Sequence, residues 1–327
     1  MGEWIETNLG DVIELKRGYD LPQQQRSPGN VPLVSSSGVS DYHAVAKVKG
    51  PGVVTGRYGT LGQVYYVTDD FWPLNTTLYI RDFKGNDPRF VSYFLRSLDF
   101  HAYSDKAAVP GLNRNHLHLA QVRIPIDVLE QRAIAHILGT LDDKIELNRR
   151  TNETLEAMAR DIFKDWFVDF GPTRAKMEGR EPYLAADLWA LFPDRLDDEV
   201  KPKGWEEKRV EDILELAYGK ALKASERING NVPVYGSGGI TGYHNVALVN
   251  GPSIIVGRKG TVGSLFWEDK PFFPIDTVFY VKPEAPLTYC FYLLQSLGLE
   301  AMNTDAAVPG LNRNNVYRLK MWTHVKA

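Results

Sequence analysis

Three short clusters of polar and cationic side chains occur twice in the chain, and their residue types suit contacts with nucleic acid. The first reads Gly-Arg-x-Gly-Thr in both copies and includes Arg57, Tyr58, Arg258 and Lys259. Its glycines let the backbone turn tightly, and an arginine at a turn can form two hydrogen bonds with guanine or bind a phosphate. The alternative is a β-turn whose surface arginine forms an internal salt bridge. A phosphate-binding P-loop is not predicted, because no Gly-Lys-Ser/Thr follows.

The second cluster is a Tyr-His pair in a loop rich in Gly, Ser and Thr. It occurs as Tyr42-His43 and again as Tyr243-His244. Both side chains can stack on bases or form hydrogen bonds with DNA, but they can equally hold the loop against its own domain. A metal site is not predicted, because the seven histidines include no His-x-x-x-His spacing.

The third cluster lies in a nine-residue segment, 107–115, that returns unchanged at 306–314. Asparagine and arginine are the side chains that pair bidentately with adenine and guanine. The predicted contact residues are Asn113, Arg114, Asn115, Asn312, Arg313 and Asn314. The alternative is a structural turn that caps the following strand.

All three clusters belong to a larger duplication. Residues 31–62 and 232–263 are identical at 16 of 32 positions. A domain-sized unit present twice argues against a solenoid of short repeats and suits a target with two similar, non-identical halves. Within each copy, short strands precede a helix without regular alternation, which predicts an α+β fold. The expected strands are 52–56, matched by 253–257 in the second copy, and the aromatic strand 64–67, matched by 277–280. The expected helices are 90–97 and 289–296.

The sequence therefore predicts four parts: a first copy of the repeated domain at 1–126, a long coiled-coil-forming helix at 127–170, a connector at 171–204 and a second copy of the domain at 205–327. Within the connector, the apolar stretch 184–192 predicts one short helix.

The long helix starts at a capping pattern, Asp127 with Glu130, and stops at Phe170-Gly171-Pro172, where we expect the glycine to turn left-handed. At about 1.5 Å per residue it is a rod of about 60 Å. Apolar residues spaced alternately by four and three predict a seam that packs on another helix. The seam consists of Ile134, Leu138, Leu141, Ile145, Asn148, Asn152, Leu155, Ala159, Ile162 and Trp166. Its two asparagines either select one helix register or face solvent.

Composition limits the other classes of function. The net charge is −3, but residues 1–126 and 205–327 each carry 13 basic and 12 acidic side chains, so the acidity lies between them. Binding of the isolated chain to DNA is then expected to be modest and salt-sensitive. The single cysteine, Cys290, excludes an intrachain disulfide and favours a reducing cytoplasm. No apolar stretch reaches the length of a membrane helix, and no cofactor is predicted.

Together these motifs resemble the specificity subunit of a type I restriction-modification system. The resemblance covers nearly the whole chain. It is sharpest along the helix, from Glu130-Gln131 through Leu141-Asp142 to Asp169-Phe170-Gly171-Pro172, and in the repeated Gly-Arg-x-Gly-Thr and Val-Pro-Gly-Leu-Asn-Arg segments. It implies that the repeated domains 1–126 and 205–327 are target-recognition domains 1 and 2. It further implies a non-catalytic subunit that reads an asymmetric, bipartite site on double-stranded DNA, one half per recognition domain. It also implies methyltransferase subunits as direct partners and restriction subunits as partners through the complex.

One departure from the family concerns the second of its two antiparallel helices. Aligning the copies places Ala327 opposite Val128, so this sequence stops where that helix is expected to begin. The expected consequence is a homodimer in which the helix 127–170 pairs with the same helix of a second chain. The alternative is that a methyltransferase subunit covers the seam.

Three other functions are weaker. A methyltransferase needs an Asn/Asp-Pro-Pro-aromatic motif, and Asp87-Pro88-Arg89-Phe90 lacks the second proline. Pro193-Asp194 with Glu199-Val200-Lys201 resembles a nuclease signature, but it lies in the connector without the strands that would orient its carboxylates. The third alternative is a coiled-coil adaptor that does not touch DNA. No rule relates these loops to the bases they would read.

Overall fold

The computed structural model describes residues 2–105, 111–303 and 309–324. The chain forms two compact units, Met1–Thr151 and Asn152–Ala327, which meet within the long helix α4 (Val128–Phe167). We call residues 1–126 module 1 and residues 205–327 module 2, in keeping with the proposed domain boundaries. No helix of the described residues is long and apolar enough to cross a membrane.

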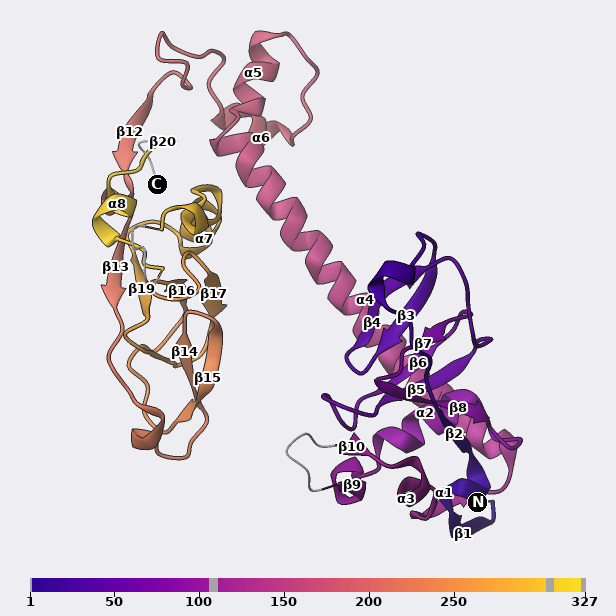
Figure 1. Cartoon of the computed structure of the whole chain (residues 1–327). Coiled ribbons are helices and arrows are strands. Elements are labelled where there is room, and N and C mark those ends of the chain that lie inside the picture. Colours follow the sequence, from indigo (N-terminus) through magenta and orange to yellow (C-terminus); the bar gives the residue numbers. More distant parts are fainter. Residues whose placement is uncertain (1, 106–110, 304–308, 325–327) are drawn as a thin grey trace. The chain divides into compact units, whose positions relative to one another are not determined.

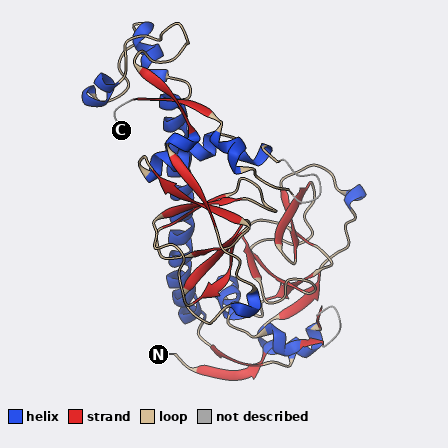
Figure 2. Ribbon diagram, turned by 90° about the vertical axis from the view of Figure 1, so that its left-hand side faces the viewer, coloured by secondary structure: helices blue, strands red, loops and turns tan. Residues whose placement is uncertain are grey.

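Module 1 is built mainly on antiparallel strands, and Figures 1 and 2 show the strands of the chain. A four-stranded sheet has the order β2 (Glu14–Arg17), β8 (Thr77–Asp82), β5 (Gly52–Gly56) and β6 (Val64–Val67). A three-stranded sheet has the order β4 (Gly38–His43), β3 (Val31–Ser35) and β7 (Trp72–Pro73), with β7 parallel to β3. Two strand pairs complete it: β1 (Trp4–Asn8) with β11 (Gln121–Pro125), and β9 (Ser104–Asp105) with β10 (Gly111–Leu112). Its helices are α1 (Leu9–Val12), α2 (Pro88–Arg96) and α3 (Arg114–His118).

Module 2 repeats this order, which confirms the α+β duplication. Its four-stranded sheet runs β13 (Leu214–Tyr218), β19 (Val278–Pro283), β16 (Ser253–Gly257) and β17 (Leu265–Glu268). Its three-stranded sheet runs β15 (Gly239–His244), β14 (Val232–Gly236) and β18 (Phe273–Pro274). β12 (Trp205–Arg209) pairs with β20 (Lys320–His324), and the helices are α7 (Leu287–Ser296) and α8 (Arg313–Tyr317).

One predicted correspondence was wrong. We matched the aromatic strand 64–67 with residues 277–280, but β6 occupies the sheet position of β17, whereas Val278 begins β19, the counterpart of β8. Both β17 and β19 carry aromatic residues, so composition does not distinguish them.

The strands β5 and β16 are buried along their whole length because both of their faces are covered. Val53 belongs to the main hydrophobic core with Phe90 of α2, whereas Val54 packs in a second cluster with Val34 of β3. Such two-sided burial explains why these strands read as continuous β-branched runs rather than as an alternation of polar and apolar residues.

Helix α4 begins as expected, with the Asp127 carboxylate accepting a hydrogen bond from the Leu129 N–H at 2.9 Å. Glu130 accepts a bond from the Trp4 indole instead of closing a capping box. The expected left-handed glycine was wrong: Phe170 adopts φ 58°, and Gly171 opens a further helix, α5 (Gly171–Met177). A Cβ at Gly171 would lie 1.9 Å from Asp165 Oδ1, so a larger residue here would require the Asp165 side chain to move.

The connector carries the predicted short helix as α6 (Ala186–Leu191), in addition to α5, which we did not predict. Aromatic residues of the connector and its surroundings pack together, including Phe170, Phe192 and Trp205. The connector is therefore an ordered part of the second unit.

The predicted seam of α4 is covered only at its ends. Ile134 packs against the core of the first unit, and Trp166 contacts the Phe192 ring at a centroid distance of 5.4 Å. Of the seam residues between them, Ala159 is half-buried and the others are exposed: Leu138, Leu141, Ile145, Asn148, Asn152, Leu155 and Ile162. Phe163, which lies beside the seam, is buried in the core of the second unit.

Candidate nucleic-acid interface

In module 1 the structure brings the first and third clusters together. The Leu112 N–H donates to the Arg57 carbonyl oxygen at 2.9 Å, and Tyr58 forms an antiparallel bridge with Gly111. The two segments, far apart in sequence, thereby form one pocket. This module 1 pocket is lined by Arg17, Arg57, Tyr58, Leu78, Gly111, Leu112, Asn113, Arg114 and Asn115.

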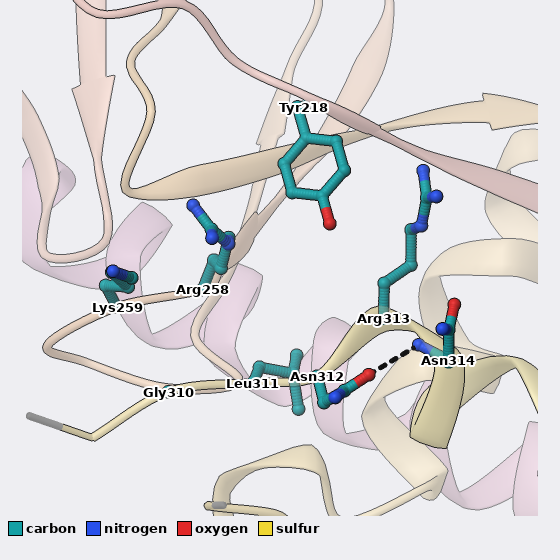
Figure 3. Close-up of a pocket in the computed structure, with 8 residues that line it drawn as sticks. All are labelled: Tyr218, Arg258, Lys259, Gly310, Leu311, Asn312, Arg313 and Asn314. Carbon is teal, nitrogen blue, oxygen red and sulfur yellow. Dashed lines mark hydrogen bonds between the residues drawn. The ribbon is translucent and has the colours of Figure 1, made fainter. Parts of the chain in front are cut away.

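Module 2 contains the same arrangement. The Leu311 N–H donates to the Arg258 carbonyl oxygen at 2.8 Å, and Lys259 forms an antiparallel bridge with Gly310. The module 2 pocket, shown in Figure 3, is lined by Tyr218, Arg258, Lys259, Gly310, Leu311, Asn312, Arg313 and Asn314. Residues 107–110 and 306–308 of the repeated segment lie outside the described residues.

Backbone hydrogen bonds hold each Gly-Arg-x-Gly-Thr turn. The N–H groups of Arg57 and Tyr58 both donate to the Thr76 carbonyl oxygen, at 2.8 and 3.3 Å. In module 2 the corresponding acceptor is the Thr277 carbonyl oxygen, at 2.9 and 3.0 Å from its two donors. The second glycine of each turn has a positive φ, 79° at Gly59, a conformation that favours glycine. Each turn is therefore hydrogen-bonded to the residue that directly precedes β8 in module 1 and β19 in module 2.

Each pocket gathers positive charge and excludes negative charge. Three cationic side chains line the module 1 pocket and three line the module 2 pocket, and neither lining includes a carboxylate. Among the described residues none of these six cations forms an ion pair with a carboxylate, so the salt bridge that we considered as an alternative is not formed there. The charged hydrogen-bond donors thus stay available to an anionic ligand. Arg258 does donate one hydrogen bond, to the Asp276 carbonyl oxygen at 2.9 Å.

Tyrosine rings contact the pocket arginines. The Arg57 guanidinium lies 4.5 Å from the Tyr58 ring centroid. In module 2, Arg258 and Arg313 lie 5.0 and 4.9 Å from the centroid of Tyr218, and Figure 3 shows the ring between them. These distances are those of cation–π contacts.

Sequence reasoning missed Arg17 and Tyr218. They end the equivalent strands β2 and β13 and face the repeated clusters across each pocket. The shift of 201 positions that relates Arg57 to Arg258 also relates Arg17 to Tyr218. Extending the alignment of the copies upstream of residue 31 would have paired them.

The third cluster also caps a helix rather than the strand we had considered. Asn113 Oδ1 accepts a hydrogen bond from the Asn115 N–H at 3.0 Å at the start of α3, and Asn312 does the same for Asn314 at 2.9 Å at the start of α8. The side-chain oxygens of Asn113 and Asn312 are occupied by these capping bonds. A bidentate contact with adenine uses both amide atoms, so these bonds compete with it. The arginine that follows each capping asparagine, Arg114 or Arg313, lines the pocket and carries the positive charge of the third cluster.

The short helices are attached to the strands opposite them by matching hydrogen bonds. His118 Nε2 accepts from the Leu15 N–H at 3.0 Å, and the Tyr317 hydroxyl accepts from the Leu216 N–H at 2.8 Å. Burial, together with the nearby charge of Arg114, lowers the pKa of His118. A neutral imidazole is required here, because a protonated Nε2 cannot accept this bond.

The Tyr-His pairs are not among the residues that line these two pockets. His43 is 5% exposed, accepts a hydrogen bond from the Ser27 N–H at 2.9 Å and meets the Trp72 ring edge-on. His244 is similarly buried and accepts from the Ile228 N–H at 3.0 Å. For the two histidines the structure therefore favours the alternative, in which they hold their own loops. The adjacent Tyr42 and Tyr243 are exposed.

The motifs of the rival enzyme classes have structural roles. Asp87 caps α2 by accepting from the Phe90 N–H at 2.9 Å. In the connector, Asp194 pairs with Lys176 at 3.1 Å, and Lys201 pairs with both Asp197 and Glu199. Within the described ranges, no group of three or more His, Cys, Asp or Glu side chains is placed to hold a metal ion.

Comparison with known proteins identifies related sequences. The sequence model of the family described as "Type I restriction modification DNA specificity domain" matches residues 1–157 and 202–320. The type I restriction enzyme MjaIX specificity subunit of Methanocaldococcus jannaschii is 27% identical over 242 residues, which cover 66% of this chain and 53% of that protein. The HindI specificity subunit of Haemophilus influenzae is 29% identical over 296 residues, covering 69% of this chain and 63% of that protein.

The chain therefore spans between half and two thirds of the length of these two relatives. Among solved structures, the type I restriction-modification system S subunit from M. genitalium superposes with a TM-score of 0.58 at 19% identity, over 99% of this chain and 85% of that one. At this identity the likeness establishes the fold and nothing further.

Proposed function

The chain belongs to the family of type I restriction-modification DNA specificity proteins, and from that premise we propose that it is the DNA-reading subunit of such a complex. Each module reads one half of a bipartite, asymmetric site on double-stranded DNA. The chain itself has no catalytic role, and the modification and cleavage reactions belong to its partners.

The observation that carries this proposal is the pair of cationic pockets without carboxylates. Each module as a whole carries 13 basic and 12 acidic side chains, a net charge of only +1. Within each module, however, three cations converge on one pocket that adjoins exposed asparagines. Concentrated positive charge beside hydrogen-bonding side chains is what phosphate and base-edge contacts require.

The exposed stripe of α4 supports a second part of the proposal, the protein partners. Leu141, Ile145 and Leu155 are each more than half exposed. A row of apolar residues at coiled-coil spacing is stable in water only when another helix covers it. We expect the same helix of a second chain to do so, while methyltransferase subunits bind alongside and recruit the restriction subunits.

The defining test concerns the bipartite site. A randomised pool of duplexes is selected on the full chain with its methyltransferase subunit, and the enriched sequences are read. Two short motifs at a constant separation are expected, and inserting or deleting two or three base pairs between them should abolish selective binding. Binding that ignores this separation, or enrichment of a single continuous motif, would contradict the proposal.

A further inference from the structure

The two pockets contain matching sets of chemical groups, arranged differently. Superposing the repeats pairs Arg57 with Arg258 and Arg114 with Arg313, so two arginines are shared. The remaining cation and the tyrosine exchange places. Module 1 has Arg17 at the end of its strand and Tyr58 in its turn, whereas module 2 has Tyr218 at the end of its strand and Lys259 in its turn.

In module 1 the ring belongs to the turn. Tyr58 lies against the backbone of Gly111, where an added Cβ would come within 2.5 Å of the ring atom Cε1. Its face holds the Arg57 guanidinium at 4.5 Å. The exposed Arg17 is then the cation on the opposite wall.

In module 2 the ring belongs to the opposite wall. Tyr218 lies between the two shared arginines, with Arg258 at 5.0 Å and Arg313 at 4.9 Å, as Figure 3 shows. Arg313 also donates to the Leu216 carbonyl oxygen at 3.4 Å. The exposed Lys259 occupies the turn position that Tyr58 fills in module 1.

The place of the ring matters because an arginine recognises guanine through a planar fork. Two parallel hydrogen bonds form only when the guanidinium plane is aligned with the base edge. A ring that attracts the guanidinium onto its face limits the planes the guanidinium can adopt. A tyrosine on one wall therefore aims the shared arginines differently from a tyrosine on the other wall.

We infer that residues 17 and 58 in module 1, and residues 218 and 259 in module 2, are specificity-determining pairs. They position the shared arginines and decide which bases each module accepts in its half of the duplex. Arg57, Arg114, Arg258 and Arg313 supply the contacts common to both halves. This inference rests on the proposed function, because it names the residues by which the same pockets distinguish two DNA sequences.

The tyrosine and the cation can be exchanged within either module without changing its net charge. Arg17→Tyr with Tyr58→Lys gives module 1 the arrangement of module 2, and Tyr218→Arg with Lys259→Tyr does the reverse. All four residues are exposed, so both double variants are expected to keep the wild-type melting temperature. Having two reciprocal variants keeps the test informative if one of them fails to fold.

The test is selection of randomised duplexes on the full chain with its methyltransferase subunit. The module 1 exchange is expected to change base preference at one or more positions of one half-site by about tenfold. The other half-site should be unaffected, and so should the salt dependence of binding to a random duplex, because the charge is constant. The reciprocal exchange should alter only the other half-site.

Two results would overturn the inference, and only the second would also overturn the proposed function. If the wild-type chain enriches a bipartite motif that both folded exchange variants leave unchanged, the inference is wrong and the proposed function stands. If the wild-type complex enriches no motif, the proposed function fails and the inference fails with it.

Discussion

Gln131 Nε2 donates a hydrogen bond to Asn86 Oδ1 at 2.7 Å, joining the first turn of α4 to the loop before α2. The same amide donates to the Pro125 carbonyl oxygen at 2.9 Å and accepts from the Asp87 N–H at 2.9 Å. Gln131 is completely buried. The start of the long helix is therefore held on module 1 by a fully satisfied polar contact, which apolar spacing along the helix does not reveal.

Gln131→Leu should destabilise the first unit, because it keeps side-chain size but leaves the Pro125 carbonyl oxygen, which is buried, and the Asn86 side-chain oxygen and Asp87 N–H, which are partly buried, without this partner. Each such group costs about 1–3 kcal/mol when unsatisfied, so we expect the free energy of unfolding to fall by at least about 2 kcal/mol. Urea denaturation measures the change. The control is Arg132→Ala, which removes an exposed ion pair with Asp87 of 3.7 Å and should cost less than about 1 kcal/mol. Equal effects of the two substitutions would contradict this stabilising role of the buried amide.

Stability of the first unit should depend on His118 protonation. The pKa of His118 is lowered in the folded chain from 6.5, so the native state takes up this proton less readily than the unfolded state. The stabilisation is fully present above pH 6.5 and is lost as the pH falls through the lower, folded pKa. His118→Tyr copies Tyr317, whose hydroxyl accepts the equivalent bond. Among side chains, histidine is the one that ordinarily changes charge between about pH 5 and pH 8.

Melting temperatures measured from about pH 8 to pH 5 compare the two proteins. The variant is expected to retain more stability than the wild type at the acid end, with little difference at the neutral end. Parallel curves would mean that the Leu15–His118 bond does not govern acid sensitivity.

Arg57→Ala should weaken DNA binding by about tenfold and reduce the slope of log K against log salt concentration by about 1, because one phosphate or base contact is lost. Arg81→Ala is the charge-matched control. Arg81 lies on β8 and pairs with Glu14 rather than lining the pocket. Fluorescence anisotropy across a salt series measures both quantities. A control that weakens binding as much as Arg57→Ala would indicate a general charge effect instead of a site.

Ile145→Asp should abolish pairing of α4 without unfolding the chain. Its side chain is 66% exposed and lies in the apolar stripe, so the substitution costs little in the isolated chain but places a carboxylate in the helix interface. Leu147→Asp is the matched control, because Leu147 is 64% exposed on the same helix but outside the stripe. Light scattering at tens of micromolar should show a dimer for the wild type and the control and a monomer for Ile145→Asp. If the wild type is a monomer, the predicted homodimer is wrong, and the methyltransferase subunit is the expected partner of the stripe. Its binding is then measured with the same variants.

Local pattern predicted much of this protein. The duplication, the α+β class, the strands β5 and β16, and the long helix all follow from spacing and from residue preferences that act over a few positions. The two clusters that meet in each pocket are also predicted by the sequence, because their motifs recur in both copies. The residues of a repeated segment do not show which other segments it contacts in the folded chain. The sequence therefore leaves both the DNA-contact and the structural interpretation of each cluster open.

Tertiary structure decided the rest, because pocket walls and burial depend on segments that are distant in sequence. Arg17 reaches its pocket from a strand 40 positions before Arg57, and Tyr218 faces Arg313 across 95 positions of chain. His43 and Tyr42 are neighbours at the end of the same strand, yet His43 is buried against the Trp72 ring and the Ser27 backbone while Tyr42 is exposed. The sequence alone determined which side chains were available for the proposed contacts with DNA. Chain folding determined which of them share a surface, because only packing brings the end of one strand against the turn of another.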